Sequence, residues 1–337
     1  IVKGKEHETS FNEEAAIIKT LGGSLLFSSG EATFSSIDLI NKEFKSSGNQ
    51  QINLSKSYLK RHKIFRKKLL STVSSLNKIK VCVIGDLIID EYISCNALGM
   101  SQEEPTLVVT PIDSKKFVGG AGIVAAHFAS FSKNVTLTTV INKDKLGNLA
   151  KKILKKYKVK LNPIYEHDRP TTEKSIFISK DHNLLKVNNV SNQPISNTSL
   201  DKIKKRLKKN DYDIFIIADY RHGIFNTQSC KEIIKSISKK AFKAADSQVA
   251  SRWGNILDFK GFNLITPTEQ EARYSLFEQD LTIRTLADKL MKNSKSKNII
   301  LKIGEKGLIA LANKKPEYIT LDPFVENLKD ANGAGDA

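Results

Sequence analysis

Cysteine is scarce in this sequence, and the three that occur, Cys82, Cys95 and Cys230, lie far apart. Three widely spaced thiols form neither a disulfide framework nor the closely spaced ligand set of a structural zinc site. No apolar run reaches the ~20 residues that a membrane-spanning helix needs, and no secretory signal segment is recognisable. The sequence therefore predicts a protein of the reducing cytoplasm with no membrane partner.

Acidic residues are also few, because 36 Asp and Glu stand against 54 Lys and Arg, which gives a net charge of +18. The basic residues are scattered among Ile, Leu, Asn and Ser. No zinc-finger spacing, helix-turn-helix signal or aromatic RNA-binding motif accompanies them. A lysine-rich solvated surface is the simplest interpretation, and attraction to anionic substrates or to nucleic acid is the alternative. A nucleic acid is not an expected partner.

Both ends of the 337-residue sequence interrupt an expected element, so we expect a fragment. The chain begins at Ile1, within a strand-like run, and ends one residue after Asp336, where a helix should start. Residues 1–44 predict a strand end at 1–4, a helix at 12–21, a strand at 24–28 and a helix at 35–44. Residues 45–78 are polar and basic and predict a linker that is helical in its second half, or alternatively an anion-binding arm.

Residues 79–337 alternate between strand-like and helix-like segments, which predicts an α/β domain with a mostly parallel sheet and helices on both faces. The expected strands lie at 81–84, 135–140, 214–218, 241–245, 262–265 and 299–303. The expected helices lie at 120–131, 146–157, 199–208, 227–238 and 282–291. Two segments, 92–110 and 174–187, break the rhythm and predict β-rich insertions that form a small β lid.

Chemically useful residues follow several of these strands, at the edge where open α/β sheets bind ligands. Asp86 and Asp90 come after the first strand, where a carboxylate accepts hydrogen bonds from vicinal sugar hydroxyls; an ordinary turn is the alternative. Gly119 and Gly120 precede an Ala-rich helix and allow backbone amides to approach a ligand closely. Asp219 follows the strand at 214–218.

Two further segments follow later strands. Glu271, after the strand at 262–265, is placed to hold Mg²⁺ through water or simply to favour a helix N-terminus. Gly304 and Gly307 flank a hairpin turn, whose functional interpretation places a nucleotide against the backbone. Each signal is weak alone, but their order and their strand-end positions make them strong together.

The closing run Gly333-Ala334-Gly335-Asp336 carries the most specific chemistry. Small residues at a helix start expose successive backbone N–H groups, which hold an anion together with the helix dipole. The carboxylate that follows is placed to take a proton from an attacking hydroxyl. This combination predicts phosphoryl transfer from a nucleotide to an alcohol, whereas a Gly-rich turn with a helix-capping Asp is the bland alternative.

Taken together, these motifs resemble the ribokinase/PfkB family of carbohydrate kinases over residues 80–337. The runs Ile84–Tyr92, Ser101…Glu104-Pro105 and Arg169–Lys174 are most similar to the heptose-7-phosphate kinase half of bifunctional ADP-heptose synthases. Residues 1–44 resemble the closing part of a cytidylyltransferase-like nucleotidyltransferase domain. The resemblance implies a ribokinase-like three-layer α/β sandwich with a β lid, preceded by a remnant of a Rossmann-like domain.

The resemblance also implies an activity, ATP- and Mg²⁺-dependent phosphorylation of a sugar or sugar phosphate, with a role for each matching residue. Asp336 would be the base, and the amides of Gly333, Ala334 and Gly335 would form the anion hole. Glu271 would organise Mg²⁺. The sugar would be held by Asp86, Asp90, Gly119, Gly120 and Lys174. The nucleotide would be bordered by Asp219, Gly304, Gly307 and Asn332.

Four positions depart from the family pattern and leave a non-catalytic sugar- or nucleotide-binding protein as the alternative: Ile123, His222, Gln248 and Thr268. The helix that should follow Asp336 lies beyond the sequence, so we expect residues 1–337 alone to be inactive. The nucleotidyltransferase histidine motif would lie upstream of Ile1, so that second activity is not expected either. Pairing of many relatives through the lid suggests a homodimer by analogy.

Overall fold

The computed structural model describes residues 2–4, 26–28, 59–60, 63–180, 182–249, 254–313, 315–321 and 335. The chain divides into two compact units, which consist of 1–50, 92–115 and 177–185, and of 51–91, 116–176 and 186–337. The domain boundary expected after residue 44 and the helices expected at 12–21 and 35–44 lie outside the described residues.

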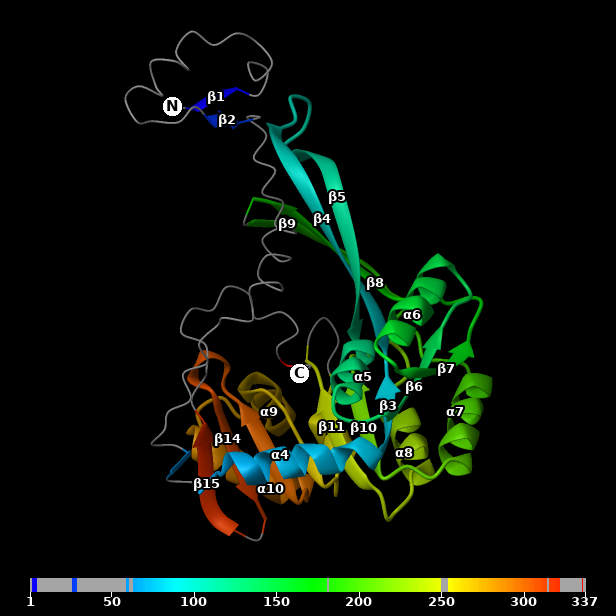
Figure 1. Cartoon of the computed structure of the whole chain (residues 1–337), viewed down its shortest axis with the longest axis vertical. Coiled ribbons are helices and arrows are strands. Elements are labelled where there is room, and N and C mark those ends of the chain that lie inside the picture. The colour runs from blue at the N-terminus through cyan, green and yellow to red at the C-terminus, as the bar shows by residue number, and fades with distance from the viewer. Residues whose placement is uncertain are drawn as a thin grey trace. The chain divides into compact units, whose positions relative to one another are not determined.

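Two small β arrangements match the strands expected outside the main sheet. β1 (Val2–Gly4) pairs in parallel with β2 (Leu26–Ser28). A four-stranded sheet has the order β5-β4-β8-β9 (Figure 1). Its strands are β4 (Leu87–Met100), β5 (Leu107–Gly120), β8 (Glu173–Ser179) and β9 (His182–Asn189). The two predicted β-rich insertions therefore form one sheet of their own.

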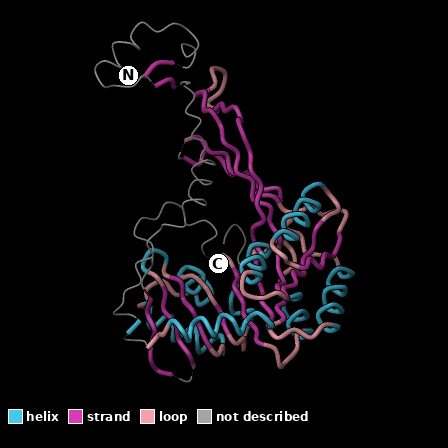
Figure 2. The backbone as a smooth tube through the Cα atoms, in the orientation of Figure 1, coloured by secondary structure: helices cyan, strands magenta, loops and turns pink. Residues whose placement is uncertain are grey.

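The second unit is built on a nine-stranded sheet of order β15-β14-β13-β12-β11-β10-β3-β6-β7. Figure 2 shows magenta strands of this unit among cyan helices. Pairing is parallel from β13 to β7 and antiparallel between β13, β14 and β15. The strands are β3 (Lys80–Gly85), β6 (Asn134–Ile141), β7 (Lys160–Tyr165), β10 (Ile214–Asp219), β11 (Phe242–Ser247), β12 (Leu264–Ile265), β13 (Asn298–Lys302), β14 (Leu308–Ala312) and β15 (Lys315–Leu321).

Helices cover both faces of this sheet. Successive residues of β3 point to opposite sides, so that Val81 and Val83 join one buried cluster while Cys82 and Ile84 join the other. The first cluster includes residues of α5 (Ala121–Ala129) and α6 (Lys145–Lys156). The second includes residues of α7 (Asn197–Lys209), α8 (Thr227–Ser236), η4 (Ile256–Phe259), α9 (Glu269–Leu276) and α10 (Ile283–Ser294). The three-layer α/β architecture is thereby confirmed.

Side-chain caps fix where several of these helices begin. Asn226 and Ser229 form a capping box at α8, and Thr268 and Glu271 form another at α9. α4 (Arg66–Ser75) and η3 (Leu76–Lys78) precede β3 and lie in the part of 45–78 that was expected to be helical, while the role of that segment as a linker stays a prediction. β7 was not predicted from the sequence, because Pro163 interrupts its pattern; a proline is tolerated there because β7 is an edge strand.

All three cysteines are buried and none forms a disulfide. Burial raises the pKa of the Cys82 thiol to about 12 and also raises the pKa of Cys230, so both are held as neutral thiols. Both side chains belong to the same apolar cluster on the α7–α10 face. Among the described helices, none combines the length and apolar character required to cross a bilayer.

Phe259 tests the packing of the larger cluster. Its side chain is 0% exposed, and its ring meets those of Phe225 and Phe262 at centroid distances of 5.9 and 5.7 Å. Phe259→Ala should lower the free energy of unfolding by about 3–5 kcal/mol, measured by urea denaturation. Phe277→Ala is the matched control, because Phe277 is 86% exposed and its loss should change stability by less than about 0.5 kcal/mol.

Candidate functional site

Several of the predicted site residues lie at one edge of the nine-stranded sheet. Parallel strands present their carboxyl ends at the same edge, and β3, β10, β11, β12 and β13 are consecutive or near neighbours in the sheet order. Asp86 follows β3, Asp219 ends β10, and Lys302 ends β13. The topology therefore brings together residues that are more than two hundred positions apart in the sequence.

Asp86 is 3% exposed, and its carboxylate is engaged by main-chain amides. Oδ2 accepts hydrogen bonds from the N–H groups of Tyr220 (3.3 Å) and His222 (3.1 Å), and Oδ1 accepts one from Ile224 (3.3 Å). Burial raises the pKa of Asp86, and these three amides oppose that rise by favouring the charged form. In this structure Asp86 holds the turn after β10 against the end of β3.

Asp90 lies directly against the glycine pair that precedes α5. A Cβ atom built on Gly119 would lie 1.8 Å from Asp90 Oδ2, and one on Gly120 would lie 2.6 Å from the Asp86 carbonyl oxygen. Gly120 also has a positive φ of 55°, a conformation that side chains disfavour. The loop must therefore be glycine, and the structure brings Asp90, Gly119 and Gly120 together as the sequence predicts.

Asp219 forms a buried polar cluster with Arg221. The Arg221 guanidinium lies 2.9 Å from Asp219 Oδ2 and 2.5 Å from Asp258, and Ser247 Oγ donates to Asp219 at 2.7 Å. Burial raises the pKa of Asp219 to about 7, although the Arg221 charge opposes the rise. No motif in the sequence pointed to Asp258, which lies in a short 3₁₀ turn.

A mixed-charge cluster occupies the ends of β11, β12 and β13. Lys302 Nζ lies 3.1 Å from Asp246 Oδ1, and Thr266 Oγ1 donates to the same oxygen at 3.2 Å. Burial raises the pKa values of Asp246 and Glu271, and the Asp246 charge raises that of Glu271 further. Glu271 is 7% exposed, and its Oε2 accepts the Thr268 N–H at 2.7 Å, as expected for the helix-capping alternative.

The glycine turn follows β13 directly, and one residue of the closing motif, Gly335, contacts this cluster. β13 and β14 form the predicted hairpin through η5 (Gly304–Lys306), in which Gly304 and Gly307 have φ values of 58° and 86°. Gly335 is among the residues that the structure describes, and its carbonyl oxygen accepts a hydrogen bond from Lys302 Nζ at 3.4 Å. The other closing-motif residues lie outside the described residues: Asn332, Gly333, Ala334 and Asp336.

Lys174 is partly exposed on β8, beside a charged network that the sequence did not reveal. Lys116 Nζ lies 2.9 Å from Glu91 and 2.5 Å from Glu173, and Ser175 Oγ donates to Glu91 at 3.0 Å. Glu91 follows Asp90 directly and Glu173 precedes Lys174. The network therefore fixes the backbone on either side of two predicted sugar ligands.

The positions that depart from the family pattern have structural partners of their own. His222 is 8% exposed, and its carbonyl oxygen accepts from Arg169 at 3.0 Å. The Gln248 N–H donates to the Asp219 carbonyl oxygen at 3.0 Å. Thr268 accepts the Glu271 N–H as the N-cap of α9. Ile123 is partly exposed on α5.

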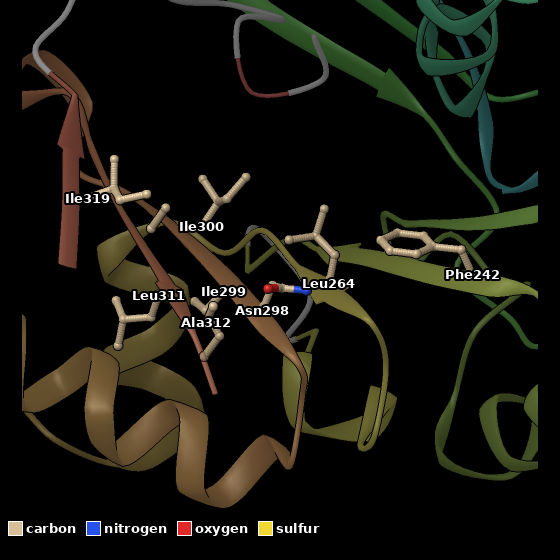
Figure 3. A pocket seen from close by; sticks show the side chains of 9 residues that line it. Phe242, Leu264, Asn298, Ile299, Ile300, Leu311, Ala312 and Ile319 are labelled. Atoms are coloured by element: carbon tan, nitrogen blue, oxygen red, sulfur yellow. The ribbon is translucent and has the colours of Figure 1, made fainter. Parts of the chain in front are cut away.

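One apolar cavity lies on the sheet away from these charged groups. It has a volume of about 370 Å³ and is lined by residues of β11 to β15, including Phe242, Leu264, Ile300 and Ile319 (Figure 3). Asn298 is its one polar lining residue. The residues that line this cavity include no acid, base or anion ligand.

Comparison with known proteins identifies the class to which this fold and site belong. Residues 78–337 match the sequence profile of the pfkB family carbohydrate kinases. Because that match spans more than half of the sequence, the chain belongs to this family of carbohydrate kinases.

Particular relatives refine the comparison. The chain is 29% identical over 267 residues to the bifunctional protein HldE of Aliarcobacter butzleri, and 28% identical over 271 residues to that of Desulfatibacillum aliphaticivorans. These matches cover 77% and 78% of this chain. The chain spans about half, 54%, of the length of each relative. The confirmed prediction is therefore the kinase family and its HldE-like relatives; the nucleotidyltransferase connection stays a prediction.

Solved structures show the same fold at low sequence identity. Phosphofructokinase-2 from Escherichia coli in complex with fructose-6-phosphate superposes with a TM-score of 0.61 at 14% identity, covering 77% of this chain and 84% of that one. Ribokinase of Arabidopsis thaliana complexed with ribose and ATP gives a TM-score of 0.59 at 17% identity, covering 77% and 83%. The ribokinase-like fold is thus confirmed.

The raised pKa of Asp219 predicts a pH-dependent difference between the wild type and Asp219→Asn. Its folded pKa of about 7 lies above the ordinary value of 3.8, so the stability that it contributes is fully present below pH 3.8 and is lost as pH rises through 7. Asp219→Asn lacks this titration, so its stability relative to the wild type should increase by up to about 1.4 kcal/mol for each unit that the pH rises toward 7, and should change little above pH 7. Urea denaturation from pH 5 to 8 measures this; parallel profiles for the two proteins would contradict it.

Proposed function

We propose that this chain carries the kinase domain of an enzyme that transfers the γ-phosphoryl group of ATP to a hydroxyl of a sugar or sugar phosphate. The observation that carries the proposal is the gathering of strand-end acids, glycine loops and a lysine at the carboxyl edge, in a chain of the carbohydrate kinase family. The HldE relatives favour a heptose phosphate as the sugar, and three buried thiols without a disulfide fit a cytoplasmic location.

The sugar side of the proposed site is the loop formed by Asp90, Gly119 and Gly120. The Asp90 carboxylate would accept hydrogen bonds from two sugar hydroxyls, and the glycine amides would approach the ring closely. Asp86 would support this side indirectly, because its carboxylate accepts hydrogen bonds from the Tyr220–Ile224 turn. Lys174 would complete this side.

The nucleotide side is formed by the ends of β10 to β13. Asp219, Gly304, Gly307 and Asn332 would border the nucleotide, and the amides of Gly333, Ala334 and Gly335 would stabilise charge on the transferring phosphoryl group. Asp336 would take the proton of the attacking sugar hydroxyl while the oxygen of that hydroxyl forms a bond to phosphorus. ADP would leave with the electrons of the broken P–O bond.

The donor set fits a magnesium ion that is held mainly by phosphate and water. Among the described residues no group of three or more His, Cys, Asp or Glu side chains could form a protein cage for a metal. Asp246 and Glu271 are two electrostatically coupled, largely desolvated carboxylates, and Mg²⁺ bound to nucleotides needs only one or two. When bound, the ion would neutralise phosphate charge.

Asp336→Asn tests the chemical step. Removal of a general base typically lowers turnover by about 10²–10⁴-fold, and the amide keeps the shape of the side chain. ATP-dependent phosphorylation of a panel of sugars and sugar phosphates is measured for protein expressed from the complete gene and, in parallel, for residues 1–337. Unchanged turnover in the variant would refute the role of Asp336. ATP binding without turnover by the wild type would favour the non-catalytic alternative.

Gly119→Ala tests the sugar side, because its new methyl group would displace the Asp90 carboxylate. We expect kcat/KM for the sugar to fall by about 10²-fold while ATP affinity is unchanged. Asp90→Asn should have the same phenotype, and the double variant should be no worse than either single one, since both remove one interaction. Additive losses, or weakened ATP binding, would show that the glycine serves another purpose.

A further inference from the structure

Lys302 occupies a position that none of the predicted motifs covers. It is the last residue of β13, and its ammonium group contacts Asp246 Oδ1 at 3.1 Å and the Gly335 carbonyl oxygen at 3.4 Å. The side chains of Lys302 and Asp246 are each 22% exposed, so the pair lies at the border between protein and solvent. A ligand at this edge can therefore reach the ammonium group.

The backbone of Lys302 is firmly held, whereas its side chain is long and adaptable. The Lys302 N–H donates to the Pro267 carbonyl oxygen at 2.9 Å, and residue 302 forms a parallel β-bridge with Thr268. An ammonium group on a four-carbon stem can change partners by rotation of side-chain bonds alone. The strand therefore fixes the backbone position of Lys302, while its ammonium group is able to exchange one charged partner for another.

The charges around Lys302 are those that would exchange partners when a nucleotide arrives with a metal ion. Asp246 and Glu271 lie close enough for each carboxylate to influence Lys302 or the other acid electrostatically. A divalent cation would take over the neutralisation of these acids. The ammonium would then be available to the phosphate chain beside Gly335, where a lysine acts as a point charge.

We propose that Lys302 is a phosphate-binding residue that pairs with Asp246 in the nucleotide-free protein and turns to the phosphate chain of the nucleotide when it binds. This inference rests on the proposed function, because it assigns a further ligand within the proposed nucleotide site. It predicts that Lys302 recognises phosphate and contributes nothing to recognition of the nucleoside.

Calorimetric titration with adenosine, ADP and ATP separates these contributions. In protein expressed from the complete gene, Lys302→Met should weaken ADP and ATP binding by about 10- to 100-fold, as expected for loss of a hydrogen bond to a charged group. Adenosine affinity should stay within about twofold, and Lys302→Arg should restore much of the ATP affinity. Lys297→Met is the matched control, because it removes an equal charge from an exposed residue just before the opposite end of β13.

Asp246→Asn gives a second test, whose sign depends on the metal. In a magnesium-free buffer with chelator, the variant releases Lys302 from its competing carboxylate, so ATP should bind more tightly than to the wild type. With Mg²⁺ present, the advantage should disappear or reverse. A change that is merely structural would weaken ATP binding under both conditions.

The outcomes separate the inference from the proposed function. If the wild type binds neither ATP nor adenosine, both fall together. If the wild type binds ATP and Lys302→Met binds it equally well, or loses adenosine affinity in equal measure, the inference alone is overturned. Circular dichroism and thermal unfolding of each variant establish that the compared proteins are folded, and Asp246→Asn carries the test if Lys302→Met does not fold.

Discussion

The buried carboxylate of Asp86 is the interaction on which the arrangement of the site depends. It comes from the loop after β3, yet it accepts hydrogen bonds from three amides of the turn after β10. A carboxylate that is 3% exposed is stable only when such donors replace the lost water. The Asp86 carbonyl oxygen also accepts the Ala121 N–H at 3.0 Å, at the start of α5. One residue therefore fixes the sugar-side glycine loop and the Asp219 turn in a single frame.

Charged side chains are neutralised in different ways on the proposed sugar side and on the proposed nucleotide side of the site. On the sugar side, glycines allow Asp90 to lie against the main chain, and the Lys116 ion pairs hold the neighbouring strands. On the nucleotide side, acids and a lysine neutralise one another at a partly exposed border. The first arrangement suits the hydroxyl groups of the proposed sugar substrate, which can donate hydrogen bonds to a fixed carboxylate. The second suits an anionic ligand that arrives with its own cation.

Much of the fold could be predicted from the sequence, because continuous apolar runs such as 81–84 and 214–218 indicate strands buried on both faces. The elements that escaped prediction lack that signal. Pro163 interrupts the strand pattern of β7, and β15, which follows the predicted β13–β14 hairpin, was not predicted. The candidate site was predictable where glycine and aspartate occur in fixed order. Lys302, Asp258 and Lys116 were not, because only the sheet order and the side-chain contacts reveal what a single charged residue faces.

The two thiols enclosed by the α7–α10 layer have a practical consequence. Cys82 is 0% exposed in β3 and Cys230 is 1% exposed in α8, and both are held in the unreactive protonated form. An alkylating reagent can modify them only when the sheet and that helical layer separate. Their rate of modification would thus follow the opening of the central layers in the native protein, with no probe introduced, and ligands that bind at the carboxyl edge should slow it.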